Sequence, residues 1–104
     1  MDKTKNLKIL DCTLRDGGYV NNWRFSQSQI LKIVGALEKS NVDIIELGYL
    51  DDKKGSSINS TLFDSVASVD AALGSLAPKV QKVVMIDLFG FNMDKLPLQS
   101  DTKI

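Results

Sequence analysis

Residues 11–19 of the chain read Asp11-Cys12-Thr13-Leu14-Arg15-Asp16-Gly17-Gly18-Tyr19. An apolar run at positions 7–10 precedes this stretch, and two glycines interrupt it that can adopt backbone angles closed to other residues. In an α/β protein, a buried strand that is followed by charged side chains and a sharp turn is typical of a functional site. Neighbouring side chains of a strand point to opposite faces, so Arg15 and Asp16 approach one centre only where the chain has left strand geometry. We expect Gly17 and Gly18 to allow that departure.

The composition is that of one small globular domain. The chain has 104 residues, 43% of them hydrophobic, with 13 basic and 13 acidic side chains. No apolar run approaches the roughly 20 residues that cross a bilayer, and residues 1–6 lack the apolar core of a signal peptide. We therefore expect a cytoplasmic protein that binds neither nucleic acid nor a membrane. The chain contains no histidine, which excludes Ser-His-Asp and Cys-His catalysis by these residues alone.

Two helices are predicted after the glycines. Ser26 and Gln29 have the spacing of a capping box, and an apolar stripe at helical spacing follows them as far as about residues 40–41. A second amphipathic pattern covers about residues 60–76, and Pro78 stops it. The tail, residues 93–104, has no clear periodicity and is expected to be a loop or a frayed end.

Three apolar runs predict buried strands near Leu7–Cys12, Asp43–Tyr49 and Lys82–Leu88. Strands that alternate with helices imply a parallel sheet with right-handed crossovers. The predicted fold class is therefore α/β, with the order β-α-β-α-β.

The opening stretch resembles a known signature. Asp11, Thr13 and the run from Leu14 to Gly17 resemble the first motif of the DRE-TIM metallolyases, metal-dependent lyases and synthases built on a TIM barrel. This family contains 4-hydroxy-2-oxovalerate aldolase, 3-hydroxy-3-methylglutaryl-CoA lyase and isopropylmalate synthase. Residues 15–25 most resemble a bacterial, aldolase-like branch.

The resemblance implies that residues 1–104 supply the first three strands of a TIM (β/α)8 barrel, whose usual size is about 250 residues. They would then form the truncated N-terminal segment of a single domain. The alternative is a complete small open-sheet protein that borrows the motif.

The family acronym names an Asp, an Arg and a Glu, which match Asp16, Arg15 and Glu46. Glu46 lies inside an apolar run, where a buried carboxylate is costly unless a cation pairs with it, and Arg15 is the expected partner. By resemblance, Asp16 is a metal ligand, Arg15 stabilises a developing enolate, and Glu46 orients Arg15 or a metal-bound water. The alternative is a buried ion pair that only joins two strands.

Two further residues belong to the candidate site. In related aldolases a His base follows the Arg-Asp-Gly closely, and Tyr19 is the candidate for part of that role, although packing or a lid role would also explain it. Asp87 follows the third predicted strand and either contacts substrate or caps its loop. The implied cofactor is Mn²⁺ or Mg²⁺, whose remaining family ligands, a His-x-His pair, are absent from this chain.

The resemblance thus predicts a divalent-metal-dependent aldolase or lyase that cleaves a carbon-carbon bond in a 2-oxo acid through a metal- and Arg-stabilised enolate. The alternatives are an acyl-CoA-dependent Claisen synthase or lyase, and a non-catalytic α/β module with a structural Arg-Asp-Glu network. We expect this chain alone to be inactive, because one carboxylate holds such an ion weakly. We also expect it to self-associate through an unpaired sheet edge.

Overall fold

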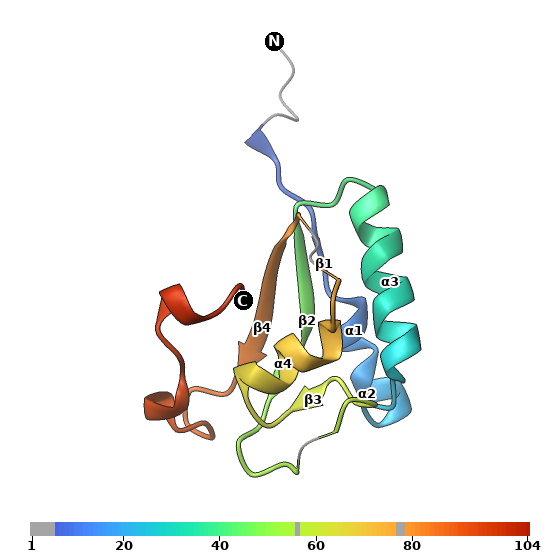
Figure 1. Ribbon diagram of the computed structural model, residues 1–104. Helices are drawn as coiled ribbons and strands as arrows, with labels where there is room; N and C mark the ends of the chain where they lie inside the picture. Colours follow the sequence, from blue (N-terminus) through green and yellow to red (C-terminus); the bar gives the residue numbers. More distant parts are fainter. Residues whose placement is uncertain (1–5, 56, 77–78) are drawn as a thin grey trace.

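The computed structural model describes residues 6–55, 57–76 and 79–104 (Figure 1). Within these residues the strands are β1 (Leu10–Asp11), β2 (Ile44–Leu50), β3 (Leu62–Phe63) and β4 (Gln81–Ile86). The helices are α1 (Thr13–Asp16), α2 (Gly18–Asn21), α3 (Gln27–Lys39) and α4 (Val66–Leu73), followed by the 3-10 helices η2 (Met93–Lys95) and η3 (Gln99–Asp101). The chain is an α/β structure with a parallel sheet, as the sequence predicts, and this arrangement is compatible with a segment of a TIM barrel.

Strand β2 is the centre of the sheet. β1 pairs with Ile44 and Ile45, and β3 pairs with Tyr49 and Leu50, while β4 pairs along both halves of β2. All these pairings are parallel. Because β4 occupies one edge over both halves, β1 and β3 must share the other edge, one after the other.

Helices α3 and α4 pack against one face of this sheet and contact each other. Both contribute buried side chains to a core that also includes the inner residues of β2 and the ring of Phe63. The fully buried members with the largest side chains are Phe63, Leu14, Ile30, Ile45, Leu47, Leu50, Val34 and Val69. The core therefore lies between the helices and one face of the sheet.

The predicted start of α3 is confirmed. The Gln29 backbone N–H donates to Ser26 Oγ at 3.1 Å, and the Ser26 N–H donates to Gln29 Oε1 at 2.9 Å. This reciprocal pair satisfies two backbone donors that a helix N-terminus otherwise leaves unpaired. The helix ends at Lys39, where Ser40 caps it, as its apolar stripe predicts.

Other boundaries were wrong. The first strand is reduced to Leu10–Asp11, and the third ends at Ile86 instead of Leu88. The second helix is shorter than predicted, because the segment before it forms strand β3. β1 leaves the sheet after pairing with Ile45, so the second half of that edge of β2 is open, and β3 fills it. Pro78, the predicted helix stop, lies outside the described residues.

The prediction about the glycines was also wrong in its physical reason. Gly17 has a φ of −61°, and Gly18 is the first residue of helix α2, so both have right-handed helical backbones. What requires glycine here is space. A Cβ built on Gly18 would lie 2.0 Å from the Trp23 ring, and one on Gly17 would lie 2.4 Å from the carbonyl oxygen of Thr13.

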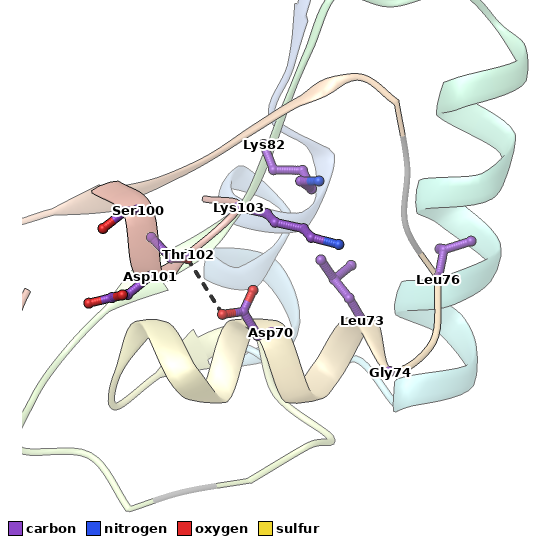
Figure 2. Close-up of a pocket in the computed structure, with 9 residues that line it drawn as sticks. All are labelled: Asp70, Leu73, Gly74, Leu76, Lys82, Ser100, Asp101, Thr102 and Lys103. Atoms are coloured by element: carbon purple, nitrogen blue, oxygen red, sulfur yellow. Dashed lines mark hydrogen bonds between the residues drawn. The ribbon is translucent and has the colours of Figure 1, made fainter. Parts of the chain in front are cut away.

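The tail packs beside β4 instead of fraying (Figure 1). Thr102 Oγ1 donates to Asp70 Oδ2 of α4 at 3.4 Å. A pocket of about 360 Å³ separates this last segment from α4 and β4, and Asp70, Lys82 and Lys103 are among its lining residues (Figure 2). None of the helices in the described residues is long and apolar enough to cross a membrane.

Candidate active site

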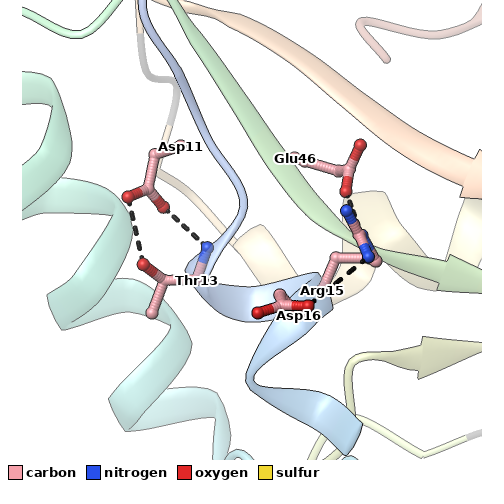
Figure 3. Close-up of polar contacts among 5 residues, drawn as sticks. All are labelled: Asp11, Thr13, Arg15, Asp16 and Glu46. Carbon is pink, nitrogen blue, oxygen red and sulfur yellow. Dashed lines mark hydrogen bonds and ion pairs between the residues drawn. The ribbon is translucent and has the colours of Figure 1, made fainter.

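Helix α1 directs Arg15 toward the central strand. Leu14 is fully buried and fixes this single helical turn against the core. From the next position, Arg15 Nε donates a hydrogen bond to Glu46 Oε1 on β2 (Figure 3). The side chains of Arg15 and Glu46 are only 21% and 13% exposed. The hydrogen bond that Arg15 donates to Glu46 raises the pKa of Arg15 further above its ordinary value, so the guanidinium stays charged.

Asp16 lies beside this pair and faces solvent. Its Oδ1 is 3.7 Å from Nη1 of Arg15, and its side chain is 72% exposed. Asp11 has a different role, because its carboxylate accepts from the Thr13 N–H at 2.9 Å and from Thr13 Oγ1 at 3.0 Å (Figure 3). Asp11 therefore holds the start of α1, while Arg15, Asp16 and Glu46 come together on the other side of it.

The described residues do not form a metal centre by themselves. Asp16 is an oxygen donor of the kind that Mg²⁺ and Mn²⁺ prefer. Within residues 6–55, 57–76 and 79–104, however, no group of three or more Cys, Asp or Glu side chains is placed to hold an ion. Asp16 fits such an ion by ligand type, as one donor of a larger set.

A bulge in β2 puts Tyr49 on the same face of the sheet as Glu46. Glu46 pairs with Val83, but Tyr49 pairs with Met85, so β2 takes three steps where β4 takes two. Val83 and Met85 lie on the same face of β4 because side chains alternate along a strand. Glu46 and Tyr49 therefore share the face opposite the helices. Strict alternation would put them on opposite faces, which is why sequence reasoning missed Tyr49.

The ring of Trp23 lies between those of Tyr19 and Tyr49 and contacts both. The Trp23 ring lies edge-on to Tyr19, with centroids 4.9 Å apart, and 6.0 Å from the Tyr49 ring. Burial is the largest cause that raises the pKa of Tyr49, and the charge of Asp87 adds to it. Tyr19 itself is 62% exposed, so it combines ring packing with access to solvent at this end of the molecule.

Asp87 caps the turn that follows β4. Its Oδ1 accepts from the Phe89 N–H at 3.0 Å, and its carbonyl oxygen accepts from the N–H groups of Gly90 and Phe91. Asp87 also lines a hollow of about 290 Å³ together with Tyr49, Asp51 and Lys53. Asp87 thus caps its loop and also lies at the edge of this hollow.

Comparisons with known proteins give partial matches. The chain is 30% identical over 82 residues to 4-hydroxy-2-oxovalerate aldolase of Pelotomaculum thermopropionicum, which is 79% of this chain and 24% of that protein. It is 37% identical over 54 residues to 4-hydroxy-2-oxovalerate aldolase 6 of Rhodococcus jostii, covering 52% of this chain and 15% of the relative. It is 28% identical over 98 residues to oxaloacetate decarboxylase of Mycobacterium tuberculosis, covering 85% and 29%.

The matched part of the chain thus spans between 15% and 29% of the length of these relatives. No protein-family model matches the sequence, and no solved structure matches it. Similarity over half of the chain or more to proteins named as aldolases and as a decarboxylase fits, in coarse terms, the DRE-TIM metallolyases.

Proposed function

We propose that this chain is the N-terminal portion of a divalent-metal-dependent lyase that cleaves a carbon-carbon bond in a 2-oxo acid, in the manner of 4-hydroxy-2-oxovalerate aldolase. The observation that carries the proposal is the hydrogen bond from Arg15 to Glu46, with the Asp16 carboxylate beside it. The relatives named as aldolases support this reaction class. In this proposal, residues 1–104 contribute the first strands of a TIM barrel.

Arg15 is the group that meets the substrate. Its guanidinium has five N–H donors, of which Nε–H is used by Glu46, so donors on Nη1 and Nη2 remain for a ligand. Breaking the bond between C3 and C4 of a 4-hydroxy-2-oxo acid places negative charge on the C2 oxygen. A guanidinium that is permanently charged and held in place stabilises that charge without losing its proton.

Glu46 and Asp16 have separate roles. Glu46 fixes the guanidinium plane from β2, which fixes the direction of its remaining donors. Asp16 presents an exposed carboxylate on the same side and would serve as one ligand of Mn²⁺ or Mg²⁺. When bound, such an ion polarises the carbonyl as a Lewis acid. Tyr19 and Asp87 stand at the rim, where they would contact the substrate.

The test measures pyruvate release from 4-hydroxy-2-oxo acids by the protein in its native reading frame, with Mn²⁺ present. We expect Arg15→Ala to lower kcat/KM by about 100-fold or more, the usual cost of losing a donor to a developing oxyanion. Arg15→Lys should also be impaired, because an ammonium cannot copy the planar fork. Arg24→Ala is the matched control, since Arg24 is the chain's other arginine and is exposed.

Two results would contradict the proposal. Wild-type protein without turnover would favour the non-catalytic module, in which Arg15 and Glu46 only join α1 to β2. Full activity of Arg15→Ala and Asp16→Asn would exclude the assigned roles even if turnover occurs. The 104-residue chain alone should show neither turnover nor tight Mn²⁺ binding by calorimetry, because no group of three or more Cys, Asp or Glu side chains among its described residues is placed to hold the ion.

A further inference from the structure

Two neighbouring cavities lie between strand β4 and the C-terminal segment. One, of about 360 Å³, is bounded by the end of α4, and the other, of about 440 Å³, is bounded by side chains between positions 96 and 104. Lys82 and Thr102 line both cavities. Lys82 precedes Val83, which pairs with Glu46, so alternation along β4 puts Lys82 on the face of the sheet opposite Glu46. Both cavities therefore lie on the helix side of the sheet.

The smaller cavity carries a surplus of positive charge. Figure 2 shows the side chains of Lys82 and Lys103 extending in the same direction, and Lys82 is only 7% exposed. The Asp70 carboxylate, which accepts from Thr102 Oγ1 at 3.4 Å, points into the same cavity (Figure 2). Asp101 also lines the cavity, but its carboxylate points away from both lysines. Two ammonium groups and one carboxylate leave one positive charge, and the repulsion between the lysines favours a bound anion.

Both lysines can donate to such an anion. An ammonium group has three N–H donors and no acceptor, so Lys82 can serve a ligand beside its contact within the chain. Lys103 is exposed, and its ammonium group is open to a ligand from the solvent side.

The larger cavity has an apolar lining. Val84 and Ile86 contribute to it from β4, and Leu96 and Ile104 from the C-terminal segment. Val84, Ile86 and Ile104 are only partly buried against the core, and Leu96 is still 39% exposed. An alkyl chain that entered this cavity would therefore remove further apolar surface from water.

We propose that the two cavities form one binding site for an amphipathic monocarboxylate. The carboxylate head lies between Lys82 and Lys103, and a medium-length alkyl chain lies in the apolar cavity between β4 and residues 96–104. The single negative charge of a carboxylate matches the single surplus positive charge, whereas a phosphate monoester brings nearly two negative charges. Neither Arg15 nor Glu46 lines either cavity, so this site is separate from the candidate active site.

Calorimetric titration of the 104-residue chain tests the site, because this chain contains every residue that lines either cavity. The ligands are acetate, butanoate, hexanoate and octanoate at neutral pH, with 1-hexanol as the uncharged counterpart of hexanoate. We expect Kd to fall about threefold to fourfold for each CH₂ added from butanoate to octanoate, as burial of an alkyl chain predicts. Hexanoate should bind more tightly than 1-hexanol, because the alcohol lacks the negative charge.

Two variants with opposite effects test the position of the carboxylate head. Lys103→Gln should raise the Kd of hexanoate about threefold to fivefold, as loss of one exposed ion pair predicts. Asp70→Asn should lower that Kd, because it removes a like charge while its amide oxygen can still accept from Thr102. Lys32→Gln is the matched control, since Lys32 is an exposed lysine of α3 that lines neither cavity, and it should leave the Kd unchanged.

A second pair of variants tests the position of the alkyl chain. Leu96→Ala should raise the Kd of octanoate about threefold and leave that of acetate unchanged, because it removes apolar lining only. Leu98→Ala is the control, since Leu98 is 72% exposed and lines neither cavity. A Kd that does not depend on chain length, or equal binding of hexanoate and 1-hexanol, would overturn the proposal. So would shifts in the same direction in Lys103→Gln and Asp70→Asn, or equal effects of Leu96→Ala and Leu98→Ala.

Discussion

Replacing Gly18 by alanine tests the packing that holds the mouth of the site together. The added Cβ would lie 2.0 Å from Cε3 and 2.3 Å from Cζ3 of Trp23, whereas carbon atoms pack at about 3.5–4.0 Å. The ring must therefore move by about 1.5 Å. Overpacking of this kind costs about 1–3 kcal/mol, and the gain in helix propensity returns less than about 1 kcal/mol at the first residue of α2. We expect a net loss of about 1–2 kcal/mol in the free energy of unfolding.

The assay is urea unfolding followed by circular dichroism, with Trp23 fluorescence recorded in the folded state. Gly35→Ala is the matched control, because no atom lies within 4 Å of a Cβ built at this position in α3. It should stabilise the protein by about 0.5–1 kcal/mol. Because the displaced ring also contacts Tyr19 and Tyr49, the emission of Trp23 should shift in Gly18→Ala alone.

A double-mutant cycle with Trp23→Leu identifies the cause. If the cost comes from the clash, Gly18→Ala should be neutral or stabilising once the indole is gone, because the backbone of Gly18 is already helical. An equal cost in both backgrounds would refute the packing argument. So would a Gly18→Ala protein with unchanged stability and unchanged emission.

Three further predictions concern the rest of the molecule. Asp52 accepts from the Asn92 N–H and lies 3.5 Å from Lys95 Nζ, which lowers its pKa below the ordinary 3.8. The contribution of the Asp52 carboxylate to stability is therefore present above about pH 4 and lost as the pH falls through the lowered pKa. Asp52→Asn should lower Tm at pH 7, and this loss should shrink as the pH falls below about 4; a loss that does not change with pH would contradict this. Ser26→Ala should cost about 1 kcal/mol in urea unfolding by removing the capping box with Gln29, and a cost near zero would contradict that cap. The isolated chain should self-associate in light scattering through its open sheet edges, and a stable monomer at high concentration would contradict this.

The local sequence determined the elements whose hydrophobic pattern extends over many residues. Thirteen residues of α3 carry an apolar stripe and a capping box, and both signals depend only on near neighbours. The runs that became β2 and β4 are apolar enough to predict buried parallel strands. The convergence of Arg15 on Glu46 was predicted because a carboxylate inside an apolar run requires a cation, and the end of the preceding strand supplies one.

Tertiary structure decided the short elements. Helix α1 has four residues, too few for any periodicity, and it is the burial of Leu14 against the core that fixes it. Strand β3 forms because β1 leaves half of one β2 edge unpaired, and Gly48 lets the backbone approach there, since a Cβ would lie 2.1 Å from the Thr61 carbonyl oxygen. Neither event has a local signal.

The tertiary structure likewise determined the face of the sheet on which Tyr49 lies. Alternation along β2 would have turned its ring toward the helices, away from Glu46. The extra residue in β2 opposite β4 reverses that assignment, and it exists only because two distant strands are paired in a shifted register. The sequence therefore predicted the charged pair of the candidate site, while strand pairing put Tyr49 on the same face of the sheet.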